Sequence, residues 1–160
     1  MRREALIDQF ANGVALFKQA LAEVPAAAMQ WRPAPGKWSV HEIVCHCADS
    51  ETNSAMRIRY LVGEDRPTIA GYDQDRWARD FDYHALPIEP SLKQIEAVRE
   101  WTTTFLRSLP TSAWSRAGMH SEMPGETYSA EMWLSIYAEH LDVHAAQIRR
   151  NVMAWKARNP

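Results

Sequence analysis

Four segments of about twenty residues carry apolar side chains at steps of three and four, and this pattern limits the fold more than any other feature of the chain. Pro25 follows the first segment and Pro110 the third, and each proline should end a helix because it lacks the backbone N–H that the next turn needs. Ser39 precedes the second segment with Glu42 three residues later, which is the spacing of a capping box. Helices are therefore expected over residues 6–24, 40–62, 92–109 (after Pro90 and Ser91) and from near 129 to 152 or 155. The stripe of the third runs through Leu92, Ile95, Val98, Trp101, Phe105 and Leu109.

Helices of this length are about 30 Å long and suit a bundle, and the chain has no alternating strand pattern of useful length. We predict an all-α four-helix bundle that forms a single domain over residues 1–160. The connection at 63–89 is long enough to run back along the bundle, so the second and third long helices should be parallel, in an up-down-down-up order. A short helix is expected at 74–81, and the connection is expected to cover one end of the bundle.

Composition and charge exclude several classes of protein. Apolar residues make up 46% of the chain and charged residues 24%, as in folded globular domains. The formal net charge of −2 gives no electrostatic reason to bind nucleic acid, and no apolar stretch approaches the roughly 20 residues that span a membrane. The first residues lead into an amphipathic segment, so no signal peptide is expected. Cys45 and Cys47 are too close in sequence for a useful disulfide, so we expect both to be small buried residues without a disulfide. A chain without disulfides is expected in the cytoplasm.

The placement of the histidines is the strongest functional signal. His140 and His144 are four residues apart on a predicted helix, so both side chains lie on one face and can hold one metal ion. The same face carries the core-type residues Trp133, Ile136 and Tyr137, so the pair should point inward or into a cleft. His46, three residues after Ile43, is a third inward histidine on another helix. The alternative to a metal site is that the three histidines are buried, hydrogen-bonded within the protein and bind no metal.

The remaining histidines do not fit a metal site. His41 lies five residues before His46, so the two side chains diverge on a helix and the sequence His41-Glu42 is no metalloprotease motif. His84 and His120 fall in connections and are interpreted as solvated or capping residues.

Three stretches, in order along the chain, resemble a known family. They are Trp31-Arg32-Pro33-Ala34-Pro35-Gly36-Lys37-Trp38-Ser39-Val40-His41-Glu42-Ile43, His46-Cys47-Ala48-Asp49-Ser50-Glu51 and Glu139-His140-Leu141-Asp142-Val143-His144. The set is similar to the DinB/YfiT-like superfamily of four-helix-bundle metalloproteins, with Cys47 where that family often has leucine. The resemblance implies the up-down-down-up order and one divalent metal ion, zinc or nickel, held by His46, His140 and His144.

Several polar residues are candidates to assist the metal. Asp49, Ser50 and Asn53 lie within about 60° of His46 around the helix. Glu51 lies further round. It is expected either to have a structural role, in which it faces the first or third long helix or pairs with Arg57 or Arg59, or to act in catalysis. Arg57 and Arg59 are also candidates to bind an anionic substrate. The alternative is that their positive charges only interact favourably with the C-terminal end of the helix dipole. The predicted catalytic residues are Glu51 and Asp49, and the residues predicted to contact the substrate or support the ligands are Ser50, Asn53, Tyr137, Trp133 and Arg57.

A metal held by three protein nitrogens keeps coordination positions open, which suits catalysis. We therefore predict a metal-dependent hydrolase or transferase that acts on a small molecule. The resemblance also implies two alternatives. One is an S-transferase that uses a low-molecular-weight thiol such as bacillithiol, mycothiol or glutathione, and the other is a non-catalytic metal-binding or stress-response protein. It further implies a homodimer.

Overall fold

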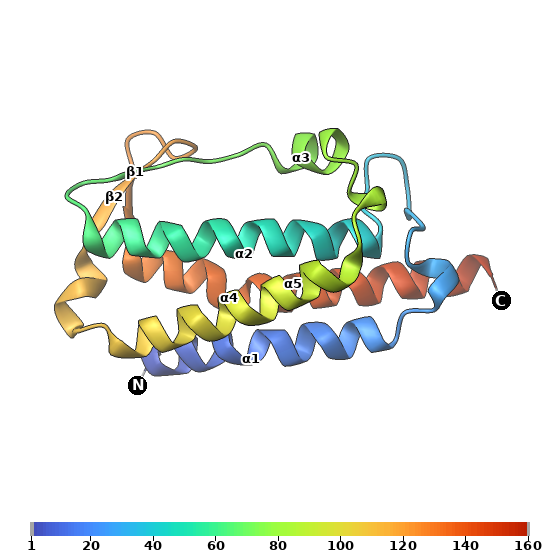
Figure 1. The fold of residues 1–160 in the computed structure, drawn as a ribbon, viewed down its shortest axis with the longest axis horizontal. Coiled ribbons are helices and arrows are strands. Elements are labelled where there is room, and N and C mark those ends of the chain that lie inside the picture. The colour runs from blue at the N-terminus through green and yellow to red at the C-terminus, as the bar shows by residue number, and fades with distance from the viewer. Residues whose placement is uncertain (1, 160) are drawn as a thin grey trace.

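Four long helices make up most of the molecule in the computed structural model, which describes residues 2–159. They are α1 (Arg2–Ala22), α2 (Val40–Gly63), α4 (Ile88–Ser108) and α5 (Ala130–Arg158). Figure 1 shows them side by side with their axes roughly aligned. The predicted all-α four-helix bundle is confirmed.

The helices run in the predicted up-down-down-up order. In Figure 1, α1 and α5 point in one direction and α2 and α4 point in the other. The closest packing is between α1 and α5 and between α2 and α4, so each tight pair is parallel. A parallel pair needs a connection that returns along the bundle, and the long segment between α2 and α4 provides it.

That connection lies along the outer side of α2 (Figure 1). It contains β1 (Thr68–Ile69), α3 (Gln74–Asp80) and a 3-10 helix, η2 (Tyr83–Ala85), so the short helix predicted at 74–81 is confirmed. The expectation that the connection covers one end of the bundle is wrong. Tyr83 anchors it to the side of α2, because its ring is buried and its hydroxyl donates a 2.5 Å hydrogen bond to Asp49 Oδ2.

A small sheet sits at one end of the connection, although no strand was predicted. It consists of β1, β2 (Ala117–His120) and β3 (Thr127–Ser129), and β2 pairs in parallel with β1 and antiparallel with β3. Strands of two to four residues are too short to show an alternating pattern. Gly118 allows β2 to lie close to the backbone just before β1, because a Cβ at this position would be 2.1 Å from the Pro67 carbonyl oxygen. Two further 3-10 helices, η1 (Ala26–Ala28) and η3 (Thr111–Ser115), complete the links.

The helix starts depend on serine caps where the sequence predicted them. Ser39 Oγ accepts a hydrogen bond from the Glu42 N–H and Glu42 Oε2 accepts one from the Ser39 N–H, so the capping box of α2 is complete. Ser129 Oγ caps α5 by accepting from the Met132 N–H. The predicted start of α4 is wrong. The helix begins at Ile88, because Pro90 falls in its first turn, where a missing N–H is tolerated.

The α4 face that enters the core also differs from the predicted stripe. Trp101 is 54% exposed, with the Arg59 guanidinium carbon 3.3 Å from the centroid of its indole ring. The buried residues of α4 are Ile95, Val98, Arg99, Thr102 and Leu106. A buried arginine thus occupies part of the inner face of α4. Because the prediction followed apolar residues alone, it placed the inner face of the helix on the side of Trp101.

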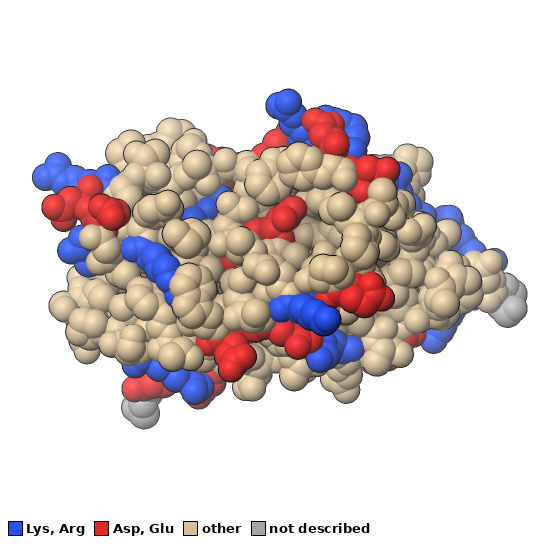
Figure 2. Space-filling view, viewed as in Figure 1, with Lys and Arg blue, Asp and Glu red and all other residues tan. Residues whose placement is uncertain are grey.

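The surface and the cysteines agree with the composition. Figure 2 shows acidic and basic side chains interspersed over one face, with no large block of one sign. Cys45 and Cys47 are both buried and neither forms a disulfide, as predicted. Within residues 2–159, no helix has the length and apolarity required to cross a membrane.

Candidate metal centre

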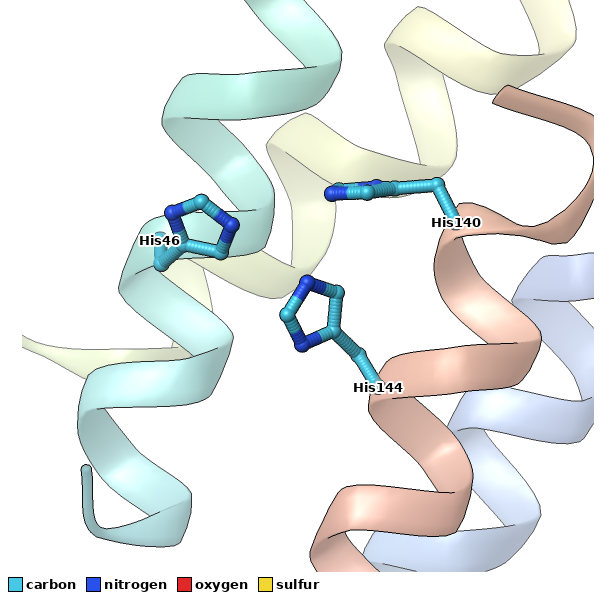
Figure 3. Close-up of side chains that lie close together, drawn as sticks. All are labelled: His46, His140 and His144. Carbon is cyan, nitrogen blue, oxygen red and sulfur yellow. The ribbon is translucent and has the colours of Figure 1, made fainter. Parts of the chain in front are cut away.

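Three histidines from two helices converge in the interior of the bundle (Figure 3). His46 comes from α2, and His140 and His144 come from successive turns of α5. Their ring centroids are 5.7 Å (His46 to His140), 5.0 Å (His46 to His144) and 4.6 Å (His140 to His144) apart. One nitrogen of each ring lies within 4.8 Å of one nitrogen of each of the other two. The arrangement is one in which a single ion can be approached by all three.

Hydrogen bonds from outside the triad decide which nitrogen two of these rings present. His140 Nδ1 lies 2.8 Å from Glu51 Oε1, and His144 Nδ1 lies 2.9 Å from Gln147 Oε1. Both partners are oxygen acceptors, so each Nδ1 carries the proton and each Nε2 keeps its lone pair. Ser50 Oγ lies 3.3 Å from His140 Nε2 and donates to that lone pair. The lone pairs that a metal requires therefore belong to the Nε2 atoms.

His46 differs from the other two rings because no hydrogen bond within residues 2–159 fixes its Nδ1. Its Nδ1 is buried and has no hydrogen-bond partner among the described residues. Burial, with the rings of His144 and His140 beside it, lowers the pKa of His46 to about 2. Burial and the neighbouring His140 lower the pKa of His144 to about 4. Both imidazoles are therefore neutral at pH 7, which is the form that binds a metal.

The donor set fits a divalent ion of the first transition row. Zinc–nitrogen bonds are about 2.1 Å long, so small rotations of the rings bring three donors onto one ion. Neutral imidazole suits zinc, nickel and copper, whereas calcium and magnesium prefer oxygen ligands. Three converging imidazoles, two of them with their Nε2 lone pairs fixed, fit a bound metal better than hydrogen bonding within the protein.

Behind His140 lies a fully buried ion pair. The Arg99 guanidinium donates from Nε and Nη2 to the two Glu51 oxygens, both at 2.6 Å, and its Nη1 donates to the Phe10 carbonyl at 2.6 Å. Burial alone would raise the pKa of Glu51, but Arg99 and His140 overcome it and hold that pKa at about 2. The carboxylate is thus ionised and presents a fixed acceptor to His140 Nδ1.

Glu51 faces α4, the third long helix, which is one of the two directions that the sequence left open. It pairs there with Arg99, and not with Arg57 or Arg59 on its own helix. Arg99 was missed. A signal was present in the sequence, since position 99 is four residues after Ile95 and three before Thr102, which places it on the inner face of the helix.

The triad opens onto a cleft of about 990 Å³ between α2, α5 and the three connections that join the long helices. The connection after α2 forms one wall of the cleft, although it was predicted to cover one end of the bundle. Lining residues are Gly36, Lys37, Trp38, His46, Ser50, Arg57, Gly71, Tyr72, Asp73, Gln74, Asp75, Ser121, Glu122, Ile136, Tyr137, His140, His144 and Gln147. Ile136 is 47% exposed at this opening, so its prediction as a core residue is wrong.

The cleft contains some of the predicted assisting residues and leaves others outside. Ser50, Arg57 and Tyr137 line it. Glu51 lies behind His140, completely buried. The remaining three do not line it. Asp49 accepts from Tyr83, and burial raises its pKa. Asn53 donates to the Asp49 carbonyl. Trp133 is fully buried and donates to the Ser54 carbonyl.

The other histidines serve the fold. His41 Nε2 lies 2.8 Å from the Leu86 carbonyl oxygen, and His84 Nε2 lies 2.8 Å from Ser39 Oγ at the start of α2. The interpretation of His120 as solvated is wrong. It is 7% exposed within β2, and its Nδ1 accepts from the Glu122 N–H. Parallel pairing of Ile69 with His120 buries it, and that pairing was not visible in the sequence.

Comparison with known families and proteins agrees with this geometry. The model of the DinB superfamily matches residues 9–148. A protein of Oceanobacillus iheyensis, named "Putative metal-dependent hydrolase", is 36% identical over 71% of this chain, and one of the same name from Halalkalibacterium halodurans is 30% identical over 74%. The chain spans 64% and 68% of the lengths of these two relatives.

Two solved structures have similar folds. YfiT from Bacillus subtilis, described as "a probable metal-dependent hydrolase with an unusual four-helix bundle topology", superposes with a TM-score of 0.85 at 26% identity, covering 93% of this chain and 85% of YfiT. The mycothiol-dependent maleylpyruvate isomerase superposes with a TM-score of 0.72 at 17% identity, covering 92% of this chain and 61% of the isomerase. At that identity the second likeness concerns the fold alone.

Proposed function

The chain belongs to the DinB superfamily, and from this membership and the three converging histidines we propose that it is a metal-dependent hydrolase acting on a small molecule. One observation carries the proposal. Three imidazoles, two of them with lone pairs fixed by outer hydrogen bonds, face an open cleft and are not sealed inside the core. Sites with three protein ligands and an open side are typical of catalysis, while structural sites are closed by a fourth ligand.

Each residue has a distinct part in this proposal. When bound, a divalent ion at His46, His140 and His144 supplies Lewis acidity and activates water for attack. Glu51 holds the Nδ1 proton of His140 and so keeps its Nε2 directed at the centre, while Gln147 does the same for His144. Arg99 keeps Glu51 ionised and fixed.

The cleft suits a small substrate. Its volume of about 990 Å³ is at the upper end of ordinary ligand sites, and its wall mixes aromatic rings with charged groups. Trp38 packs against His46, with ring centroids 4.6 Å apart and the two planes tilted by 44°. We propose zinc or nickel as the metal, because three neutral imidazoles favour both and do not separate them.

Thiol transfer is the second candidate, and the width of the cleft favours it. The cavity is larger than hydrolysis of a small ester or amide requires, and has room for a thiol and an acceptor together. A thiol that coordinates a metal is deprotonated and becomes a nucleophile. A purely non-catalytic metal-binding protein fits less well, because its site would have no use for an open side.

We also propose that the protein acts in the cytoplasm as a homodimer. Two free cysteines suit a reducing compartment. The exposed Trp101 is a residue type enriched at interfaces between subunits. Light scattering of the purified protein tests the dimer, and a mass equal to one chain would exclude it.

Elemental analysis tests the site directly. We expect nearly one zinc or nickel per chain in purified, untagged protein, and loss of that metal in the His140→Ala/His144→Ala variant while its helical circular dichroism persists. His84→Ala is the matched control, because it removes a histidine outside the triad and should keep the metal. Protein that takes up neither metal after incubation would refute the proposal.

The loaded protein is then tested with ester and amide substrates and with thiol conjugation assays. Hydrolysis that disappears with chelator and returns with metal supports the leading proposal. Thiol conjugation with the same dependence, and no hydrolysis, would replace it with the second candidate.

A further inference from the structure

An arginine without an acidic partner lies in the wall of the cleft. Arg57 forms no ion pair with any described residue, and its guanidinium donates to two neutral oxygens. They are Tyr137 Oη, 3.0 Å from Nη1, and the Ala70 carbonyl oxygen, 2.7 Å from Nη2. The positive charge is therefore positioned but not neutralised. By contrast, the other inward arginine, Arg99, is fully compensated by Glu51. Charges that are partly removed from water are normally paired, and an unpaired one in a cleft indicates a ligand of opposite charge.

Two tyrosine hydroxyls lie beside this guanidinium. Tyr137 Oη accepts a hydrogen bond from Arg57, so its own proton is left to donate. Tyr72 Oη is buried and has no hydrogen-bond partner among the described residues, although the Arg57 guanidinium carbon is 5.8 Å from the centroid of its ring. Trp77 holds the Tyr72 ring in place, with centroids 4.3 Å apart. Burial raises the pKa of Tyr137 and raises that of Tyr72 to about 12, so both remain protonated donors at neutral pH.

The group is next to the triad. The rings of Tyr137 and His140 have centroids 5.4 Å apart, and Arg57, Tyr72 and Tyr137 line the same cleft as the three histidines. The guanidinium and the two hydroxyls all offer protons, and none of them is an anion. The geometry points to a subsite in which Arg57, Tyr72 and Tyr137 bind a carboxylate of the substrate, while its reacting group lies at the three histidines. The inference rests on the proposed function and adds to it a substrate class, small molecules with a carboxylate close to the bond that reacts.

Charge favours a carboxylate over a phosphate. A single guanidinium matches one negative charge, and a planar carboxylate suits its fork of donors. The lining of the cleft also includes the acidic residues Asp73, Asp75 and Glu122 against one further cation, Lys37. Those carboxylates oppose a second negative charge on the ligand.

Bifunctional probes test the subsite separately from the metal. Succinic and glutaric monohydroxamates carry a metal-binding hydroxamate at one end and a carboxylate at the other, and the matching carboxamides have the same shape without the charge. Titration calorimetry on the zinc-loaded protein should show that the better carboxylate probe binds about 10- to 100-fold more tightly than its carboxamide, the range for a charge-assisted hydrogen-bonded contact. A phosphonate probe of the same length should bind more weakly than the carboxylate.

Three variants locate the effect. Arg57→Gln should bring the carboxylate-to-carboxamide affinity ratio close to one and leave carboxamide binding unchanged. Tyr72→Phe keeps the stacking on Trp77 and removes a hydroxyl without a partner, so it should fold normally and reduce the ratio about 3- to 10-fold. Arg59→Gln is the matched control, because Arg59 lies on the same helix but stacks on Trp101 away from the cleft, and its ratio should not change.

The outcomes separate the two proposals. A ratio near one in the parent, an unchanged ratio in Arg57→Gln, or tighter binding of the phosphonate would overturn the carboxylate subsite while leaving the metal site intact. Failure to load metal would refute the proposed function instead. Propionate titrated into metal-free protein then decides the subsite, since the Tyr72 and Tyr137 ring signals in NMR spectra should shift in the parent and not in Arg57→Gln. No such shift in the parent would refute it.

Discussion

Helix α2 carries two glutamates that have the same kinds of partner but do different work. Glu42 accepts hydrogen bonds from Arg32 at 2.5 and 2.9 Å and lies 3.6 Å from His84 Nε2. Glu51 accepts from Arg99 at 2.6 Å on each oxygen and lies 2.8 Å from His140 Nδ1. Arg32 has a side chain that is 54% exposed, whereas that of Arg99 is 1% exposed.

The difference lies in the other groups that each histidine meets. His84 Nε2 faces Ser39 Oγ and Glu42, so the first group serves only the capping box of α2. His140 presents Nε2 to His46, His144 and an open cleft. A glutamate, an arginine and a histidine therefore do not identify a site by themselves. Two features distinguish the group that supports a metal ligand from the group that caps a helix. Its ion pair is buried, and its histidine faces two further histidines.

Removing the arginine should separate the two groups most strongly. Arg99→Ala leaves Glu51 charged and buried without its partner and should lower the free energy of unfolding by about 3–5 kcal/mol. Arg32→Ala removes a half-exposed partner and should cost about 1 kcal/mol or less. Urea denaturation of metal-free proteins measures both. The double variant Glu51→Leu/Arg99→Met should be more stable than Arg99→Ala, because it leaves no unpaired charge. Equal costs at the two arginines would contradict the comparison.

Metal affinity should respond to one glutamate and not to the other. Glu51→Gln weakens the acceptor that fixes His140, and we expect zinc affinity to fall about 10- to 100-fold. Glu42→Gln should leave the affinity unchanged. Competition with a chromophoric chelator gives both constants. Gln147→Leu is a second variant that acts on His144 and leaves the Glu51–Arg99 pair intact, and we expect a loss in the same direction. A zinc affinity that Glu42→Gln changes as much as Glu51→Gln would show that the helix cap also shapes the site.

Acid should destabilise the metal-free protein through the triad. His144 has a pKa of about 4 in the folded protein, but near its ordinary value of 6.5 when unfolded. Between these values the unfolded chain binds a proton that the folded chain does not, so stability falls as pH falls, by up to about 1.4 kcal/mol per pH unit. His144→Gln should make the slope between pH 6.5 and 5 shallower by about this amount. His84→Gln should change it less, since burial lowers the pKa of His84 while a quarter of that side chain is exposed. A slope that His144→Gln leaves unchanged would argue against neutral burial of the triad.

The smallest effect should come from the cap itself. Ser39→Ala removes the oxygen that accepts from the Glu42 N–H and should cost about 1 kcal/mol of stability. Zinc stoichiometry and affinity should stay as in the parent, because the cap lies seven residues before His46 in the chain. Thermal unfolding and metal titration of the same preparation measure the two quantities. Weaker zinc binding in Ser39→Ala would mean that the start of α2 helps to position the triad.

Much of this protein was predictable from local patterns. Apolar periodicity gave four helices, and proline and serine located most of their ends, because each of these signals acts within a few residues of chain. The length of the segment between α2 and α4 was enough to predict parallel packing. The spacing of His140 and His144 places both on one face of any helix, so their proximity required no tertiary information.

Other features depend on contacts between distant residues. The start of α4 at Ile88 and the three short strands were not predicted, because the first turn tolerates a proline and strands of two to four residues have no readable period. The partner of Glu51 was left open between its own helix and a neighbouring one, since only the packing of α4 against α2 shows that Arg99 reaches it. Tyr72 was assigned to a connection expected to cover the end of the bundle, because the role of its hydroxyl is visible only when that connection lies along α2.

The sequence by itself determined the helices, their order and the helical pair of histidines, because backbone geometry converts spacing directly into position on a face. Tertiary structure decided which side chains complete the site. His46 meets the pair only through helix packing, and Arg99 neutralises Glu51 only in a shared interior. Arg57 stays unpaired because no carboxylate of the described residues comes within ion-pair distance of it, although three line the same cleft. Spacing along one element is a local property of the chain, whereas burial and charge compensation depend on residues far apart in sequence.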